Sequence, residues 1–442
     1  MQRKLSIIPF IVLAGIAVLG TLMPSVPNPT PEVLEAMKNI NSGDTAWLLM
    51  GSAMVLLMTP GLAYFYGGMV GSKNVISTML QSFIAMAVIS ILWVVVGFSL
   101  AFGTSIGGFI GDPSTYMMFN GVLDGAPWSL APTIPLAVFA LFQLKFAIIT
   151  PALITGAFAE RIRFSSYILF IVLFSMLIYA PLAHWTWHPD GFLFKMGVLD
   201  FAGGTVVHMS AGWAALAAAI YMKGRKNAEH KPANVPFVLL GTGLLWFGWF
   251  GFNAGSALGA NNLAATAFGT TNTASAAAAL AWIFFDCVKG KKPSALGACI
   301  GAVVGLVAIT PAAGFVTIPN SIMIGFVASL VSNIVVDLRS KTSLDDTLDV
   351  FPCHGVGGMV GMIMTGIFAN VAVNAANTTG NGLAFGETTL FFTHMKALVL
   401  VSVFAFGGSF VLLKLTDLIS PLRVTPEEEM EGLDLSQHGE IV

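Results

Sequence analysis

Charged residues are scarce in this sequence. They make up only 10% of its 442 residues, whereas soluble globular domains carry roughly 25%. A chain with so little charge cannot cover a water-facing surface, so an ordinary soluble fold is excluded. The net charge of −2 and the lack of a basic patch give no indication of a nucleic-acid partner.

Cysteine is also rare. Cys287, Cys299 and Cys353 all lie in or beside apolar segments. An odd number of cysteines in such places indicates buried free thiols rather than a disulfide framework.

Motifs for catalysis or cofactor binding are lacking as well. The sequence shows no nucleophile–base pair, no glycine-rich phosphate loop and no cofactor motif. His184 and His188 are four residues apart, but Pro189 follows them and no carboxylate or thiolate cluster accompanies them, which disfavours a metal site. We therefore expect neither an enzyme nor a bound cofactor.

Long hydrophobic stretches are abundant instead, and 56% of the residues are hydrophobic. A spanning helix needs about 20 apolar residues. Because backbone groups in lipid must be paired internally, only helices or a closed barrel can span. The stretches are continuous rather than alternating, so we predict an all-α polytopic membrane protein. Eleven core helices are expected near 46–68, 75–101, 132–159, 165–184, 197–222, 235–258, 263–288, 294–312, 320–338, 351–372 and 390–415.

These helices divide into two groups of five and one final helix. With an odd number per group, the second repeat (235–372) enters the membrane in the opposite sense to the first (46–222). Transporters built from inverted repeats have this arrangement, with the working site near the midplane. Together with the final helix (390–415) the repeats form a membrane domain over 24–415. A polar, acidic tail over 416–442 follows, and its composition alone is typical of a solvated terminus.

The basic residues predict the orientation. Most of them fall on alternate loops of one side, whereas the opposite loops hold only Lys38 and Lys195. By the positive-inside rule the protein crosses the cytoplasmic membrane several times with its C-terminus in the cytoplasm.

Residues 1–23 allow two interpretations. Arg3 and Lys4 precede the apolar stretch 5–20, which is the layout of a signal peptide. The stretch is also long enough for an additional N-terminal transmembrane helix, and 21–31 shows no clear small-x-small cleavage site.

Two histidines lie inside the predicted spanning helices, where ionisable side chains are costly and usually functional. His208 and His354 occupy the fifth helix of each repeat. A two-fold axis between the repeats would bring both rings to the centre, where they can share one proton. Such a pair can donate to and accept from a small polar solute without a fixed charge. Two separate core histidines are the alternative.

Asp200 begins the helix that carries His208. At 1.5 Å per residue along an α-helix it lies about 12 Å from His208, near the central path rather than in it. Its carboxylate can cap free backbone N–H groups, or it can supply a negative field that attracts a cation. The two roles are compatible, and both stay open.

Aromatic residues cluster near the predicted outer mouth. Phe142 and Phe146 are four residues apart on one helix. Phe252 and Ser256 repeat that spacing on another helix, and Trp187 follows a third. Aromatic faces attract small cations by ~0.5–2 kcal/mol, and a serine hydroxyl adds an acceptor. Most membrane aromatics serve packing or the interface, but together with the histidine pair these residues favour a cup for ammonium.

Seven stretches of the sequence resemble the Amt/Mep/Rh ammonium transporter family, most closely its prokaryotic Amt branch. They cover nearly the whole chain in the family's order: 60-PGLAYFYGGMVGSKN-74, 150-TPALITGAFAERIRF-164, 199-LDFAGGTVVH-208, 248-GWFGFNAGS-256, 350-VFPCHGVGG-358, 364-MTGIF-368 and 422-LRVTPEEEMEGLDLSQHGE-440.

The resemblance implies eleven helices in two inverted halves, assembled as a homotrimer with one pore per subunit. It places an outer recruitment site on Phe142, Trp187 and Ser256. It places a gate of stacked rings on Phe146 and Phe252, pore histidines on His208 and His354, and the buried aspartate on Asp200.

The implied mechanism is capture of ammonium outside, deprotonation near the gate and passage of ammonia along the histidine-lined pore. In electrogenic members the proton crosses too, by a route that involves the histidines. A dry pore penalises a bare cation by several kcal/mol or more, so splitting ammonium lowers the barrier. The family's tail couples subunits and helps to dock PII-type regulatory proteins, which favours a regulatory role for 416–442.

The sequence departs from the family pattern in three places. Lys145 lies between the two mouth phenylalanines and would repel ammonium if it faced the pore, unless it snorkels away. The segment 187–200 is charged and carries a histidine where the family usually has a short glycine-rich turn. The tail stops at 438-HGEIV-442, which leaves open a natural end or a fused cytoplasmic signalling domain.

Ammonium transport is therefore the leading hypothesis. An ammonium sensor that binds the ion but conducts little is the main alternative. The complete set of pore residues favours transport, whereas Lys145 and the abrupt tail favour sensing. A urea or water channel has no support beyond the apolar pore.

Overall fold

The computed structural model describes residues 2–23, 28–226 and 231–442, with side chains from residue 7 onwards. Apart from one isolated bridge between residues 162 and 423, the described strand structure is a hairpin of β1 (Ser105–Ile106) and β2 (Ile110–Gly111). These strands pair antiparallel, with Ser105 opposite Gly111. The rest of the described regular structure is helical, which confirms the expected all-α class.

The long helices follow the order of the predicted ranges. In the N-terminal half they are α3 (Ser42–Met69); α4 (Val75–Leu92) with η1 (Trp93–Gly97) and α5 (Phe98–Phe102); α6 (Leu136–Phe158); α7 (Phe164–Phe174) with η3 (Ser175–Tyr179) and α8 (Ala180–Trp187); and η4 (Gly204–Met209) with α10 (Ser210–Met222). In the C-terminal half they are α11 (Val235–Gly255), α12 (Asn262–Val288), α13 (Ala295–Ile309), α14 (Ile318–Arg339), η5 (Phe351–Val356) with α15 (Gly357–Phe368), and α16 (Thr389–Ile419).

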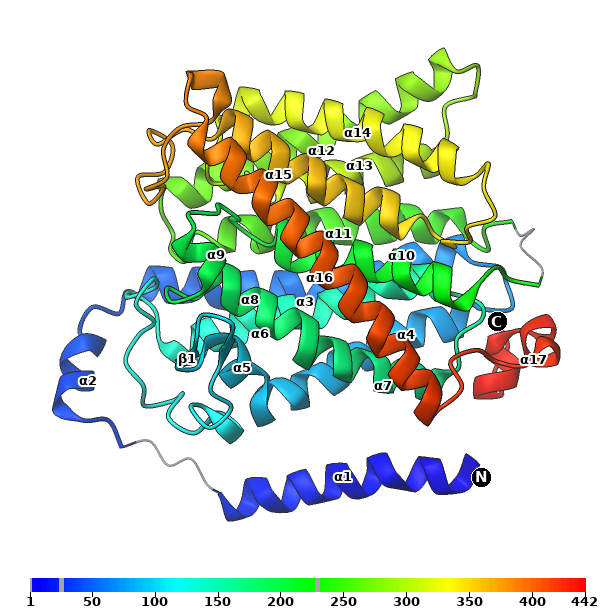
Figure 1. Cartoon of the computed structure of the whole chain (residues 1–442), viewed down its shortest axis with the longest axis horizontal. Helices are drawn as coiled ribbons and strands as arrows, with labels where there is room; N and C mark the ends of the chain where they lie inside the picture. Colours follow the sequence, from blue (N-terminus) through cyan, green and yellow to red (C-terminus); the bar gives the residue numbers. More distant parts are fainter. Residues whose placement is uncertain (1, 24–27, 227–230) are drawn as a thin grey trace.

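Short elements connect or flank these helices. They are α2 (Pro31–Met37), η2 (Met117–Phe119), α9 (Phe192–Lys195), η6 (Leu383–Phe385), α17 (Pro426–Glu431) and η7 (Asp434–His438). A further long helix, α1 (Gln2–Leu22), precedes all of them. Figure 1 shows most long helices running side by side, with α16 crossing them obliquely and α1 lying apart along one edge.

Nine helical segments within the described residues are long and apolar enough to cross a membrane, which supports a multi-pass membrane protein. Two expected spans, α12 and α13, do not reach this combination of length and hydrophobicity. Threonine and asparagine make α12 less apolar, and α13 has only 15 residues. The chain after α13 forms buried turns, and such backbone is tolerated at membrane depth when protein encloses it.

The expected helix over 197–222 begins later than predicted. Gly203 has a φ of 115°, a left-handed conformation that favours glycine and interrupts any helix. The helical turns therefore start at Gly204, and Asp200 precedes the helix instead of opening its first turn.

The first helices of the two halves, α3 and α11, pack along each other. Glycines allow the close approach. A Cβ added to Gly241 would lie 2.4 Å from the backbone nitrogen of Phe65, and one added to Gly251 would lie 2.7 Å from the carbonyl oxygen of Gly51. Small residues at such crossings let helix backbones approach within lipid. A two-fold axis between two repeats would place their first helices side by side, which is how α3 and α11 lie.

Helix α1 makes little contact with the rest of the protein. Its described side chains, from Ile7 to Leu22, are all exposed or half-buried. Within the segment 21–31, which shows no clear cleavage motif, residues 24–27 lie outside the described residues. The two interpretations of residues 1–23 therefore both remain.

The tail folds back onto the ends of the long helices. The carboxylate of Asp434 accepts a hydrogen bond from the backbone N–H of Ser77 (2.7 Å) in the first turn of α4. The backbone N–H of Leu433 donates to Asn74 (2.8 Å). Leu433 and Asp434 are buried, so this part of the tail is packed and not the solvated terminus that its composition suggests. We call the end of the molecule that carries this tail the tail side.

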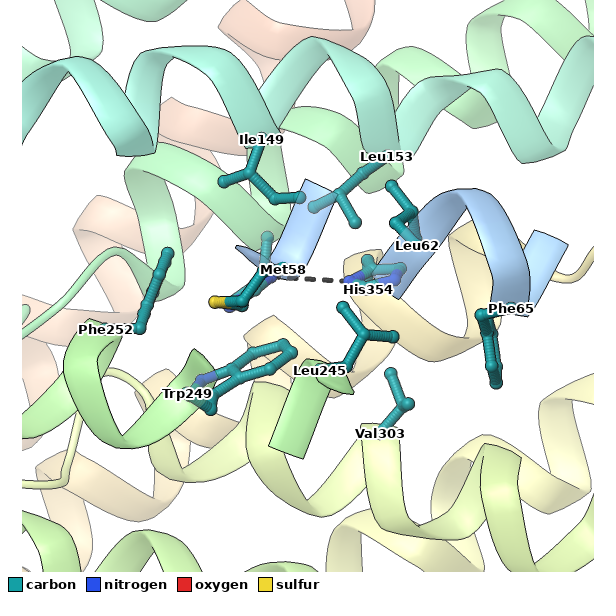
Figure 2. Close-up of a pocket in the computed structure, with 11 residues that line it drawn as sticks. Met58, Leu62, Phe65, Ile149, Leu153, Leu245, Trp249, Phe252, Val303 and His354 are labelled. Atoms are coloured by element: carbon teal, nitrogen blue, oxygen red, sulfur yellow. Dashed lines mark hydrogen bonds between the residues drawn. The ribbon is translucent and has the colours of Figure 1, made fainter. Parts of the chain in front are cut away.

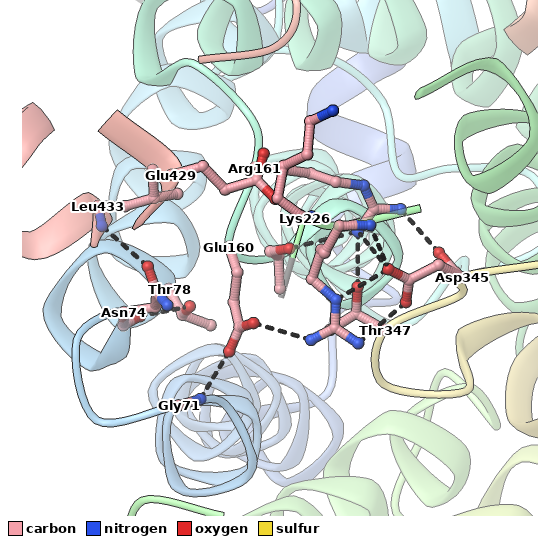
Figure 3. A network of polar contacts seen from close by, with 12 residues as sticks. Gly71, Asn74, Thr78, Glu160, Arg161, Lys226, Asp345, Thr347, Glu429 and Leu433 are labelled. Carbon is pink, nitrogen blue, oxygen red and sulfur yellow. Dashed lines mark hydrogen bonds and ion pairs between the residues drawn. The ribbon is translucent and has the colours of Figure 1, made fainter. Parts of the chain in front are cut away.

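A buried polar network on the tail side ties the two halves together (Figure 3). The Arg161 guanidinium donates to the hydroxyl of Thr347 and to the carbonyl of Asp345, both at 2.7 Å. Arg225 forms ion pairs of 2.8 Å with Glu160 and Asp345. Burial lowers the pKa of Arg161 to about 10, so this guanidinium stays charged at neutral pH. These contacts hold the loop after α6 against the loop after α14.

Candidate functional site

A cavity of about 100 Å³ lies between aromatic residues, one of which is Phe194 of α9. Helix α9 lies at the end of the molecule opposite the tail side (Figure 1). About 10–15 Å³ of such volume is enough for one water molecule, so this cavity has room for a small ion. We call it the vestibule. Its wall consists of Trp128, Leu130, Phe139, Gln143, Phe146, Trp187, Phe194, Phe201, Ser256 and Leu258.

Two of the three predicted recruitment residues, Trp187 and Ser256, line the vestibule. The Ser256 hydroxyl donates to the carbonyl of Phe252 (2.8 Å), which leaves its oxygen lone pairs as acceptors. Phe142 does not line the cavity. Its ring lies 5.0 Å from that of Phe146, buried under Gly255, where an added Cβ would lie 2.8 Å from the Phe142 ring.

Gln143 is a vestibule residue that the sequence reasoning missed. It is 8% exposed, and its amide oxygen is buried with no hydrogen-bond partner among the described residues. A buried polar atom without a partner costs ~1–3 kcal/mol. Gln143 is thus a vestibule residue whose amide oxygen lacks a donor. A polar residue within the apolar helix α6 was the available signal.

Two stacked rings close the vestibule at its base. The centroids of Phe146 and Phe252 are 4.1 Å apart, with an angle of 28° between the ring planes. Trp187 meets Phe146 edge to face at 5.8 Å. Phe146 lines the vestibule, and Phe252 lines the next cavity. The structure thus brings the two predicted gate residues together between two cavities.

The next cavity holds the histidine pair and measures about 10 Å³ (Figure 2). Nδ1 of His208 and Nδ1 of His354 are 3.4 Å apart, so one nitrogen donates and the other accepts. The remaining ring nitrogen of His208, Nε2, is buried with no partner among the described residues. Apart from the two imidazoles, the cavity wall is apolar or aromatic: Met58, Leu62, Phe65, Ile149, Leu153, Leu245, Trp249, Phe252 and Val303.

A third cavity, also of about 10 Å³, continues towards the tail side. It shares Phe65, Val303 and His354 with the histidine cavity. The rest of its wall consists of Tyr66, Met69, Ile300, Leu348 and Cys353. The vestibule, the stacked rings and the two small cavities therefore follow one another through the molecule.

Both histidines lie in π-helical turns, η4 and η5. Such turns are rare and often mark functional sites. An aspartate lies eight residues before each histidine, at 200 for 208 and at 346 for 354. The carboxylate of Asp346 accepts a hydrogen bond from the backbone N–H of Phe351 (2.7 Å), the first residue of η5. The carboxylate of Asp200 accepts backbone hydrogen bonds at the start of η4 in the same way. The sequence reasoning named Asp200 and missed Asp346, although the equal spacing was visible.

The carboxylate of Asp200 is fully occupied by its own turn. It accepts from the backbone N–H groups of Gly203 (2.8 Å), Gly204 (2.6 Å) and Thr205 (2.7 Å), and from the Thr205 hydroxyl (2.5 Å). A carboxylate offers about four lone-pair positions, so none is left for a direct bond to ammonium. The carbonyl oxygen of Asp200 accepts from the indole N–H of Trp187 (3.0 Å), so the residue also positions the vestibule wall.

Lys145 is half-buried and lines neither the vestibule nor the histidine cavity. It therefore does not face the cavities in which it would repel a cation.

The two histidines considered as metal ligands, His184 and His188, make local structural contacts. His184 and His188 stack at 4.3 Å, and His184 bonds to the carbonyl of Ala101 and the hydroxyl of Ser105. Within the described residues no group of three metal-ligand side chains occurs. Cys287 is exposed, which corrects the expectation of three buried thiols.

Comparison with known proteins gives consistent matches over almost the whole chain. The model of the Ammonium Transporter Family matches residues 46–442. An ammonium transporter from Bacillus subtilis is 48% identical, with 90% of this chain and 98% of that relative covered. The crystal structure of Mep2 from Candida albicans has a TM-score of 0.84 at 34% identity, with 92% and 91% covered. A sensor Amt protein has a TM-score of 0.81 at 31% identity, with 90% and 98% covered.

Proposed function

Because the chain belongs to the ammonium transporter family, we propose that it moves ammonium or ammonia across the cytoplasmic membrane. The observation that carries this proposal is the sequence of spaces along one path. Phe146 lines the aromatic vestibule, Phe252 lines the cavity of the histidine pair, and the rings of these two residues stack on each other.

Ammonium is captured in the vestibule. The ring faces of Trp187 and Phe146 attract the cation by ~0.5–2 kcal/mol each, and more when water is excluded. The oxygens of Ser256 and Gln143 accept two of its four N–H bonds. Asp200 contributes its negative field without touching the ion. Phe142 supports the ring of Phe146 from behind.

The proton is lost near the stacked rings. Moving a bare cation into an apolar cavity costs several kcal/mol or more, whereas neutral ammonia avoids that cost. The histidine cavity of about 10 Å³ is close to the space that one water-sized molecule needs. His208 and His354 offer ammonia one donor and one acceptor there, and a chain of ring nitrogens over which a proton can pass.

The architecture follows from the same family membership. We infer eleven spans in two inverted repeats of five (46–222 and 235–372) and a final span at α16. The equal Asp-to-His spacing in the two halves and the pairing of α3 with α11 support the repeat. The basic loops put the tail side in the cytoplasm. We also infer a homotrimer, and a regulatory tail that meets a PII-type protein. No part of this mechanism requires a catalysed covalent reaction.

An ammonium sensor is the second candidate function. The similarity to a sensor Amt protein, which spans 90% of this chain, favours it. The two functions share capture in the vestibule and differ in whether ammonia then passes the stacked rings and crosses the membrane.

Electrical measurement separates them. We expect purified protein in a lipid bilayer to give a sustained current after an ammonium pulse and none after an equal potassium pulse. The current should increase with protein density. A brief transient alone, as expected for binding without net charge crossing the membrane, would support the sensor or electroneutral passage of ammonia instead of electrogenic transport.

A further inference from the structure

His394 is a buried histidine that the proposed mechanism does not use. It lies on α16, outside the two repeats, and is 0% exposed. Its Nε2 accepts from the backbone N–H of Leu199 (3.1 Å), and its Nδ1 lies 2.8 Å from the carbonyl oxygen of Met362 on α15. Because a backbone N–H only donates, Nε2 carries no proton and Nδ1 donates to Met362. The two bonds fix a neutral ring in one tautomer.

The bond to Leu199 holds the chain at the residue directly before Asp200. Asp200 in turn accepts from the indole of Trp187 through its carbonyl. Its carboxylate caps the π-helical turn that carries His208. His394 is therefore connected, through one backbone segment, to both the vestibule wall and the pore.

Close packing of α15 against α16 places the His394 ring between Met362 and Leu199. A Cβ added to Gly366 would lie 3.1 Å from the Cα of Phe391 and 3.5 Å from the Cβ of His394, so glycine lets α16 approach α15. The Leu199 N–H has no other acceptor in the described part of the chain. Without His394 this buried donor would be unpaired, which native structures rarely tolerate.

We propose that His394 is a positioning residue for ammonium binding. It anchors Leu199 so that Asp200 holds Trp187 against the vestibule, and it does not touch the ion itself. The inference rests on the proposed function in one respect only, namely that ammonium binds in the vestibule.

Two substitutions test the two hydrogen bonds of the His394 ring separately. His394→Asn puts an amide N–H near the position of Nδ1 and keeps the bond to Met362, but it is too short to reach Leu199. His394→Gln puts an amide oxygen near the position of Nε2 and keeps the bond to Leu199. Ser409→Ala is the matched control, because Ser409 is buried on the same helix and its hydroxyl has no partner among the described residues.

The test measures ammonium affinity by calorimetry on purified protein, and KM and maximal current in a bilayer. We expect His394→Asn to raise Kd and KM about tenfold, the equivalent of ~1.4 kcal/mol, with the maximal current within about twofold of the parent. We expect His394→Gln and Ser409→Ala to keep both constants within about twofold. A loss of ground-state binding with unchanged turnover is the signature of a residue that positions the binding site.

Two results would overturn the inference. One is an unchanged Kd in His394→Asn. The other is an equal rise in both His394 variants, which would indicate lost packing and not a lost anchor. If His394→Asn does not fold, His394→Gln decides alone, since a tenfold rise in its Kd at an unchanged unfolding temperature contradicts the proposal. A parent protein that binds ammonium without sustained current would refute electrogenic transport, while the Kd comparison would still decide the role of His394.

Discussion

The unpaired amide of Gln143 allows a quantitative prediction for the vestibule. Its amide oxygen is buried without a partner among the described residues. When ammonium enters, that oxygen accepts from a charged N–H donor. Hydrogen bonds to charged groups contribute ~1.5–3 kcal/mol, and each 1.4 kcal/mol is a factor of ten in affinity. Gln143→Leu should therefore raise the Kd and KM for ammonium by about 10- to 100-fold.

The assay for this prediction is ammonium-evoked current over a range of concentrations, together with direct binding. Gln81→Leu is the matched control. Gln81 is 1% exposed and its amide oxygen also lacks a partner among the described residues, but it lines none of the three cavities. We expect the control to keep its KM. Equal KM values in Gln143→Leu and the parent would refute the view that this amide binds the ion.

Three further predictions concern the scaffold around the site. Asp200→Asn replaces an acceptor oxygen with a donor at a carboxylate that accepts four hydrogen bonds. It should therefore lower the free energy of unfolding by about 1–2 kcal/mol and weaken ammonium binding. An unchanged melting temperature would contradict the capping role. Gly241→Leu should prevent folding or strongly destabilise it, because its Cβ would meet the backbone of α3 at 2.4 Å, and overpacking costs ~1–3 kcal/mol or more. Gly243→Leu, at a position with nothing within 4 Å, should leave stability unchanged in the same thermal assay. Asp434→Ala removes the acceptor for Ser77 and with it a cap of ~1 kcal/mol, so limited proteolysis should cut the tail about fivefold faster; equal rates would show that this contact does not hold the tail.

Some of the candidate site could be predicted from the sequence because its residues stand out against an apolar background. His208 and His354 are ionisable groups in spanning helices, and Phe146 and Phe252 share helical spacing with their neighbours. The structure places both pairs in contact. Their roles in transport stay predictions, since geometry alone does not test them.

Other features depend on distances that no sequence spacing fixes. Phe142 and Phe146 share a helix face, yet only Phe146 lines the vestibule, because the ring of Phe142 packs against Gly255 of α11. The late start of the helix at Gly204 depends on the backbone conformation of Gly203. Asp346 was missed because its loop has the polar composition of a solvated segment, whereas the structure buries it completely.

The histidine pair is the part of the mechanism on which the rest depends, so its removal is the most direct test. We predict that His208→Ala combined with His354→Ala abolishes the ammonium-specific current in a bilayer while ammonium still binds in the vestibule, because the cavity then offers neither a donor and acceptor for ammonia nor ring nitrogens for a proton. Undiminished ammonium-specific current in that double variant would contradict the account.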